Sequence, residues 1–503
     1  MNSRNNDPRG SGLSRRSLLH GMGCLIAASA LPVARVRAGE EDGPPPEPAG
    51  TDHSVINKLS AYMSRAGEQE LPAHVAEITK FHILDTLAAM ISGAGLAPGK
   101  MAIHFAAAHT GENVATVVGS NLLCGAIQAA MVNGMLAHSD ETDDSHAPSR
   151  SHPGSGIVPA AWAAGEHFGI SGARLVRSVA LGYDVGTRVT MTLGSPYLKF
   201  LNHRSTHQIA VNFGAAAAAA CAAGLNDQQM RWVLDYAAEQ ASGITAWQRD
   251  TQHIGKSLCF AGFGARNGTT AALLISAGAT GVDDIFTGPD NFFEAFAPEA
   301  KPEGLVNKLG ERYEVTRTNI KKWTVGSPIQ APLDALVNLR RRRPFEAGEV
   351  KKVVVRVGTS GAAITNNREM PDICMQHMVA VMLLDQTASF EAAHDRERMK
   401  DPAVLRERAK IQLISDAELE KFFPRREGIV EVTFNDGTTL TERVDDVRGT
   451  SENPMGRDEV IAKCRDLIAP VTGPVRAAQL IDSVLDLESI KDIRSLRPLL
   501  QVT

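Results

Sequence analysis

The sequence has no excess of basic residues and few aromatic side chains. Its 503 residues carry a formal net charge of −5, and only 5% of them are Phe, Trp or Tyr. Nucleic-acid binding and adhesion to an anionic membrane surface both depend on clustered positive charge, so neither is expected here. The chain is long enough for two domains with a sizeable core, and its abundant alanine and glycine favour closely packed helices.

The chain also lacks the short motifs of several classes of site. Its six cysteines include no Cys-x-x-Cys pair, so a zinc ribbon or a four-cysteine iron–sulfur cluster would lack its ligands. No His-Glu-x-x-His zinc motif, EF-hand loop or Gly-x-Ser-x-Gly nucleophile elbow is present. The cysteines are therefore interpreted as free thiols, and serine hydrolase is the weakest of the function classes.

Residues 1–38 are predicted to be a signal peptide that is not part of the fold. Arg15 and Arg16 precede a modestly apolar stretch, and Val36-Arg37-Ala38 contains a small-residue cleavage site. The apolar stretch is too short and too rich in glycine to span a membrane. The paired arginines favour export by the Tat machinery to the periplasm. Residues 39–53, which contain EEDGPPPEPAG, predict a disordered linker, and no membrane span is expected in the mature protein.

Hydrophobic periodicity predicts a mainly α protein with a smaller α+β part. From Ser54 to about Gly281 apolar residues recur at helical spacing, and the alanine-rich run Phe213–Leu225 predicts a slim helix that neighbours can approach closely. EVKKVVVRVG predicts a strand, and IVEVTFNDGTTLTERV predicts a hairpin that turns at Asn435-Asp436-Gly437.

The remaining pattern completes the expected organisation. Asp372–Asp385 predicts a helix, and the highly charged Asp395–Lys410 predicts a solvated helix. We therefore expect a large all-α helical domain whose first part is 54–312, an inserted α+β lid domain at 313–448, and C-terminal helices at 449–503 that rejoin the helical domain.

The segment His138–Gly156 carries an unusual density of titratable side chains. It reads HSDETDDSHAPSRSHPGSG and holds four acids and three histidines between two apolar helical segments. The acids follow the end of the first helix, where the helix dipole disfavours negative charge. A metal site, a catalytic loop and a solvated linker are all open interpretations, because oxygen and imidazole ligands also suit hard or borderline metal ions.

The same segment, HSDETDDSH followed by SHPGSGIVPAA, resembles the MmgE/PrpD family. That family includes 2-methylcitrate dehydratases, cis-aconitate decarboxylases and iminodisuccinate epimerases. The resemblance extends from about Ser54 to Leu487 and continues, in family order, in FHILDTLAAMISG, GYDVGTRV, STHQIAVNFGAAAAAACAAGL and NPMGRDEVIAKCRDL. It implies a large helical domain with a smaller α+β lid, an active site between them, a homodimer, and chemistry without a metal or organic cofactor.

The resemblance also implies catalytic residues by position. A carboxylate, a hydroxyl and a histidine of the first family block correspond to Glu141, Ser145 and His152. A second family histidine corresponds to His207, with His203 as its competitor.

Substrate-binding positions are implied in the same way, and two of them have changed chemical type. Asp250 stands where the family has a lysine, and Gln330 stands where it has a later histidine. These changes predict poor activity on 2-methylcitrate and cis-aconitate. The remaining candidates for substrate binding are Asp144, His203, Arg204, His253 and Lys256.

Two classes of function follow. The first is a lyase, similar to a dehydratase, or an isomerase that abstracts a proton from a small hydroxy- or amino-polycarboxylate. In this function His207 is the base and His152 the acid, or the reverse. Glu141 orients His152 or tunes its charge, and Ser145 hydrogen-bonds the substrate. The second is a periplasmic protein that binds a carboxylate without catalysis.

Export gives the first testable prediction. Replacing Arg15 and Arg16 with lysine should hold the protein in the cytoplasm, because the Tat route reads the arginine pair. Cell fractionation followed by N-terminal sequencing checks this, and the mature protein should begin near Gly39. Unchanged export of the variant, or a full-length protein in the periplasm, would contradict the prediction.

Overall fold

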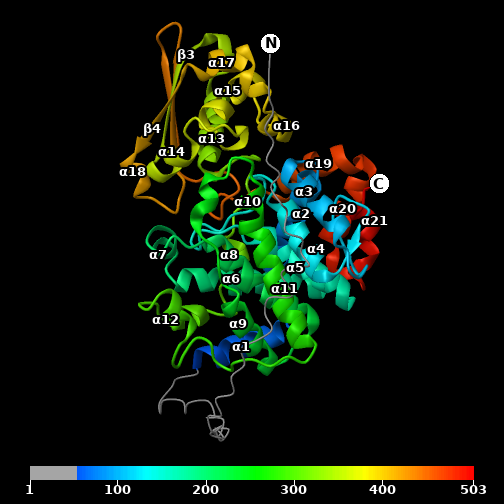
Figure 1. Ribbon diagram of the computed structural model, residues 1–503. Coiled ribbons are helices and arrows are strands. Elements are labelled where there is room, and N and C mark those ends of the chain that lie inside the picture. The colour runs from blue at the N-terminus through cyan, green and yellow to red at the C-terminus, as the bar shows by residue number, and fades with distance from the viewer. Residues whose placement is uncertain (1–53, 503) are drawn as a thin grey trace, which may run out of the picture. The chain divides into compact units, whose positions relative to one another are not determined.

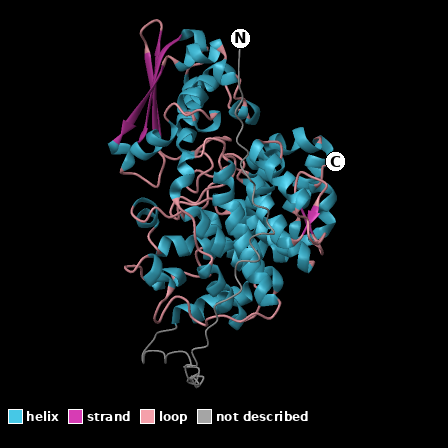
Figure 2. Ribbon diagram, viewed as in Figure 1, coloured by secondary structure: helices cyan, strands magenta, loops and turns pink. Residues whose placement is uncertain are grey.

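The computed structural model describes residues 54–502, which belong to one compact unit. The predicted signal peptide and linker lie outside the described residues. Helices dominate, and strands gather in two places, a short pair and a four-stranded sheet (Figure 2). The mainly α fold class predicted from the sequence is therefore confirmed.

The first part of the chain is helical, as its periodicity predicts, apart from a two-residue strand pair, β1 (Ala115–Thr116) with β2 (Leu123–Cys124). One turn of π-helix, Leu258–Gly262, lies between two of its helices. The helices are α1 (Ser54–Ala66), α2 (Ala73–Gly93), α3 (Ala97–Ala108), α4 (Ala126–Ala137), α5 (Gly154–Phe168), α6 (Gly172–Thr192), α7 (Ser195–Phe200), α8 (Thr206–Ala223), α9 (Asp227–Glu239), α10 (Ile254–Ser257), α11 (Phe263–Ser276) and α12 (Phe292–Phe296).

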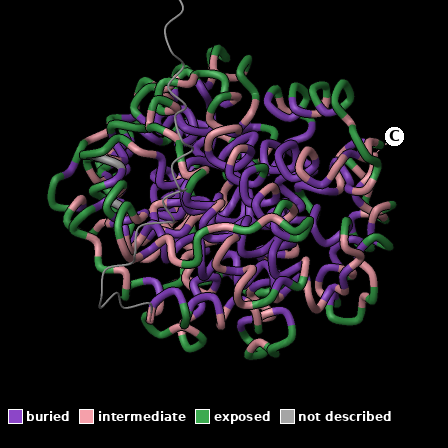
Figure 3. Tube along the Cα trace, turned by 60° about the horizontal axis from the view of Figure 1, so that its bottom comes forward, coloured by how far each residue is buried: buried purple, intermediate pink, exposed green. Residues whose placement is uncertain are grey.

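The alanine-rich helix α8 lies at the centre of this part and packs against α5, α6 and α11. All of its residues except the last, Ala223, are buried, and Figure 3 shows buried residues filling the interior. Small side chains permit the contact, because a Cβ added at Gly186 would come within 2.1 Å of the carbonyl oxygen of Ala210. The predicted close approach to Phe213–Leu225 is therefore observed.

A four-stranded sheet forms in the later part of the chain, with strand order β4-β3-β5-β6. Strands β3 and β4 are parallel, and the other neighbours are antiparallel. Its strands are β3 (Val350–Gly358), β4 (Ile411–Asp416), β5 (Gly428–Phe434) and β6 (Thr439–Val444). The helices of this part are α13 (Ser327–Arg342), α14 (Thr359–Thr365), α15 (Met375–Asp385), α16 (Phe390–His394), α17 (Pro402–Arg408) and α18 (Ala417–Glu420).

Most of the sequence predictions for this part agree with the structure. The predicted strand is β3, the predicted hairpin is β5 with β6, and the helix predicted at Asp372–Asp385 begins at Met375. The solvated helix predicted at Asp395–Lys410 is wrong as a single element. It is a 3-10 turn, Arg398–Lys400, followed by α17, and β4 comes directly after it. Strand β4 pairs with a distant strand in parallel, so no local hairpin signal marks it.

The chain ends in α19 (Arg457–Thr472), α20 (Pro474–Leu485) and α21 (Arg497–Leu500). Helices α19 and α20 pack against α2, although hundreds of residues separate them in the sequence (Figure 1). The contact includes several polar interactions, among them a buried ion pair. The Nζ of Lys463 lies 2.6 Å from Oδ1 of Asp85 and also donates to the carbonyl oxygen of Thr142 at 3.1 Å.

No single helix among residues 54–502 is both long and apolar enough to cross a membrane. Helices α2 and α3 reach that length and composition only when taken together, and they are bent by 84° at their junction.

The ion pair between Lys463 and Asp85 gives a second prediction. Both side chains are buried, so Lys463→Met leaves an uncompensated carboxylate and should cost about 3–5 kcal/mol of unfolding free energy. The matched control is Lys421→Met, whose partner Glu418 is exposed, and it should cost less than about 1 kcal/mol. Denaturant and thermal midpoints measure both. Equal effects of the two variants would contradict the prediction.

Candidate active site

The segment His138–Gly156 is a buried loop. Helix α4 ends at Ala137 and α5 begins at Gly154, as predicted. Residues His138 to Asp144 are each no more than 5% exposed. A solvated linker would expose these acids to water, so that interpretation is wrong.

Two of the four acids have structural partners. Asp144 accepts hydrogen bonds from the Tyr183 hydroxyl at 2.5 Å and from the backbone N–H of Gly154 at 3.0 Å, and it lies 2.9 Å from Nδ1 of His82. It therefore stabilises the start of α5, where the helix dipole favours negative charge. Asp140 accepts from the Thr142 hydroxyl and pairs with Nε2 of His394 on α16 at 2.9 Å.

The third acid, Asp143, lies between two histidines. Its Oδ2 is 2.8 Å from Nδ1 of His138, and its Oδ1 is 3.1 Å from Nδ1 of His152. Burial alone would raise the pKa of Asp143, but His138, His152 and Lys321 together hold that pKa well below its usual range. An ionised carboxylate only accepts hydrogen bonds. Nδ1 of His152 must therefore carry the proton, which leaves the lone pair on Nε2.

His152 is electrically neutral near pH 7. Burial lowers its pKa to about 4, and the favourable charge of Asp143 offsets this only in part. A neutral imidazole with its lone pair on Nε2 can accept a proton but has none to give from that atom. The arrangement favours His152 as a base.

A second histidine lies beside the first. His207 is in the first turn of α8, and its ring centroid is 5.2 Å from that of His152. Phe260, in the π-helical turn, stacks on His207 at 3.6 Å and on His138 at 4.4 Å. Single π-helical turns often mark functional sites, and this one inserts an aromatic ring against two histidines.

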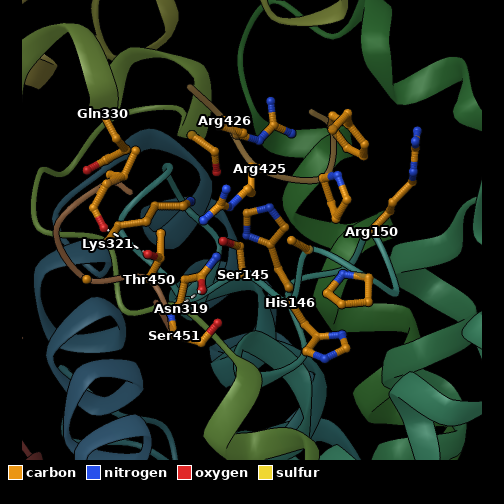
Figure 4. Close-up of a pocket in the computed structure, with 18 of the residues that line it drawn as sticks. Ser145, His146, Arg150, Asn319, Lys321, Gln330, Arg425, Arg426, Thr450 and Ser451 are labelled. Atoms are coloured by element: carbon orange, nitrogen blue, oxygen red, sulfur yellow. Dashed lines mark hydrogen bonds between the residues drawn. The ribbon is translucent and has the colours of Figure 1, made fainter. Parts of the chain in front are cut away.

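His152 and His207 line a cavity of about 420 Å³. Its wall also carries charged groups from distant segments, namely Arg150, Arg317, Lys321, Arg425, Arg426 and Arg448, together with the acids Asp445, Asp446 and Glu452. Arg317, Arg425 and Arg448 are paired with Glu314, Asp446 and Glu459, so the cations available to a ligand are fewer than the cations present. In Figure 4, Lys321 and Arg150 lie on opposite sides of the cavity, with Arg425 and Arg426 between them. The wall suits a ligand with more than one carboxylate.

Lys321 joins the loop to the cavity. Backbone hydrogen bonds between Ser145 and Asn319, at 2.8 and 3.0 Å, hold its segment against the loop. Its Nζ donates to the carbonyl oxygen of Glu141 at 2.7 Å and lies 3.5 Å from the Glu141 carboxylate and 3.6 Å from that of Asp143. The ammonium group therefore lies against the acids of the loop and is largely desolvated, with 4% of Lys321 exposed.

The structure brings four of the predicted site residues to the cavity wall: Ser145, His152, His207 and Gln330. The Gln330 amide is already committed, because its Nε2 donates to the carbonyl oxygens of Trp323 at 2.7 Å and Val325 at 2.9 Å. It fixes the start of α13, and this use of its amide accounts for its burial.

Three predicted residues lie behind that wall. Glu141 pairs with Lys256, and together with Lys321 this lysine holds the pKa of Glu141 well below its usual range although burial opposes it. The ring of His253 is buried and lies 5.1 Å from that of His138. The predicted contact of Glu141 with His152 is replaced by the contact from Asp143.

The other predicted residues lie elsewhere. Asp144 has the structural partners described above, and His203 is exposed to solvent. Arg204 stacks over Phe296 at 4.1 Å. Asp250 accepts from the backbone N–H of Lys256 at 2.8 Å, which stabilises the short helix α10. Asp250, which stands where the resemblance implies a lysine, therefore adds no carboxylate to the cavity wall.

Two overlapping groups of side chains have the spacing of metal ligands within the described residues. Both share His138: one adds Asp143 and His152, and the other adds Glu141 and His253, with ligand atoms within 4.8 Å. In each group a lysine ammonium already neutralises the carboxylate, Lys321 at Asp143 and Lys256 at Glu141. This compensation opposes the binding of a second cation at the same oxygens.

Sequence reasoning missed Lys321, Arg426 and the role of Asp143. Asp143 was visible as one of four acids, but nothing in the sequence distinguishes it from its neighbours. The pair Lys321-Lys322 shortly before Gln330 is the one signal in the sequence for a cation near the site.

Comparisons with known proteins identify the family. The MmgE/PrpD N-terminal domain matches residues 57–305, and the MmgE/PrpD C-terminal domain matches residues 323–488. A cis-aconitate decarboxylase of Aspergillus terreus is 26% identical over 89% of this chain and 96% of its own length. A cis-aconitate decarboxylase of Homo sapiens is 25% identical over 86% of this chain and 91% of its own length. The chain belongs to the MmgE/PrpD family.

Proposed function

We propose that this protein is a lyase that removes a proton from the carbon next to a carboxylate of a small polycarboxylate. The observation that carries the proposal is the 3.1 Å contact between Nδ1 of His152 and Asp143, beside a cavity whose wall includes Arg150, Lys321 and Arg426. The relatives named cis-aconitate decarboxylases support a polycarboxylate substrate. An isomerase would use the same proton abstraction.

Substrate binding follows from the distribution of charge. Arg150 and Arg426, which lie near the same ring of Phe423, bind one carboxylate, and Lys321 on the opposite side of the cavity from Arg150 attracts another (Figure 4). Burial lowers the pKa of Arg426 to about 10, so its guanidinium is still charged at neutral pH and gains from an anionic partner. The Ser145 hydroxyl lines the same cavity and hydrogen-bonds the substrate.

The reaction then needs one base and one acid. Nε2 of His152 takes the proton, and the electrons of the broken C–H bond form a double bond as a hydroxyl on the next carbon leaves. His207 gives that hydroxyl a proton, so water is released and the net charge is conserved. For decarboxylation, carbon dioxide leaves instead and the resulting carbanion is reprotonated at carbon. Decarboxylation therefore needs only the proton donor, His207, whereas dehydration also needs His152 as the base.

A carboxylate-binding protein without catalysis is the second candidate. The observation that favours it is the fully committed amide of Gln330 where the family has a histidine. The two functions differ in one measurement. An enzyme exchanges the α-proton of its substrate with deuterated water, and a binding protein leaves that proton in place.

The histidine pair gives a third prediction. His152→Asn or His207→Asn should lower turnover or proton exchange by about a hundred- to ten-thousand-fold, the usual contribution of a positioned acid or base. His203→Asn is the matched control, because that side chain is exposed outside the cavity, and it should have no comparable effect. Steady-state kinetics and exchange followed by proton NMR measure the three variants. Lost thermal stability with turnover intact at His152 would show a structural role instead.

The pKa of His152 gives a fourth prediction. A base must be neutral, so kcat/KM should stay level as pH falls from 7 to 5 and should decrease below about 4. The folded value lies below that of an unfolded histidine, about 6.5, so stability also falls as pH drops between these values. Circular dichroism at each pH separates the two effects. A rate that rises as pH falls toward 4 would assign His152 the role of acid.

A further inference from the structure

Part of the cavity wall is apolar. Ala363 and Ile364 come from α14, and Phe423 and Pro424 come from the segment between α18 and β5. Ala147 and Pro148 of the buried loop contribute to the same wall. We call these six residues the apolar strip. Ile364 remains 39% exposed, so the strip faces open space in the cavity.

The apolar strip adjoins the groups that bind carboxylates. The guanidinium of Arg150 lies 4.1 Å above the ring of Phe423, and that of Arg426 lies 5.4 Å from the same ring centroid. A carboxylate held by these arginines therefore sits beside the aromatic ring. An apolar group attached to the same ligand meets the strip without leaving the cavity.

The cavity is larger than a compact polyacid needs. Pockets of roughly 300–1,000 Å³ bury drug-sized ligands, and this one measures about 420 Å³. A six-carbon tricarboxylate is almost entirely carboxylate on its surface, so it offers little to an apolar wall. Water against the strip would remain, and displacing that water with hydrocarbon is favourable.

We propose that the substrate is a polycarboxylate with a hydrocarbon chain longer than a methyl group, seated on the apolar strip. This proposal rests on the proposed function, because it places the carboxylates at Lys321, Arg426 and Arg150. The chain lies along Phe423 and Ile364. Each methylene it buries tightens binding by about fourfold, which is about 0.8 kcal/mol per methylene converted to an affinity ratio.

The test uses a series of hydroxy-tricarboxylates that differ only in the alkyl group on the carbon next to a carboxylate: methyl, butyl and hexyl. Calorimetry gives Kd, and proton NMR in deuterated water gives exchange or turnover. Kd should fall by about fourfold per added methylene until the strip is covered. In Ile364→Ser this dependence on chain length should weaken by at least half.

The matched control for that variant is Leu405→Ser. Leu405 is 45% exposed on α17, outside the cavity wall, so the dependence on chain length should be unchanged. The wild-type series decides the proposal alone if Ile364→Ser fails to fold. The same Kd for methyl and hexyl compounds would overturn the apolar strip as a binding site. A steep Kd series with no exchange of any member would keep the strip and overturn the proposed catalysis instead.

Discussion

The buried negative charge of Asp143 is the constraint on which the site depends. A carboxylate without water costs several kcal/mol unless charged or hydrogen-bonding groups surround it. Here the partners come from three places: His138 at the end of α4, His152 before α5, and Lys321 from a segment far along the chain. The loop has this conformation because each partner must reach the same two oxygen atoms. The tautomer of His152 follows from that requirement.

The lysines explain how so many acids are buried together. Lys256 and Lys321 neutralise Glu141, and Lys321 also approaches Asp143. Of these four side chains, only Lys321 lines the cavity, so this cluster contributes a cation and no carboxylate to the wall. The acids that dominate the sequence of this loop act mainly on its shape, and the side chains that the loop places on the cavity wall include histidine, serine and Arg150.

Helices, strands and turns whose sequence signal lies within a few residues were predicted correctly. The turn at Asn435-Asp436-Gly437, the valine-rich β3 and the alanine-rich α8 each have a signal within a few residues, and each is present. Strand β4 has no such signal, because its partner is a parallel strand more than fifty residues away. The site divides in the same way. His152 and His207 stand in segments that resemble the family. The contact of His152 with Asp143, and not with Glu141, depends on the path of the loop in space, which no spacing in the sequence contains.

The contact between Lys463 and the carbonyl oxygen of Thr142 has a consequence for the order in which the protein is made. The loop is translated more than three hundred residues before the lysine that holds it. Domains generally begin to fold while the chain is still being synthesised. The helices around α8 can pack early, but the loop lacks its contact with Lys463 until α19 emerges. The conformation of the loop is therefore completed only after α19 has been made.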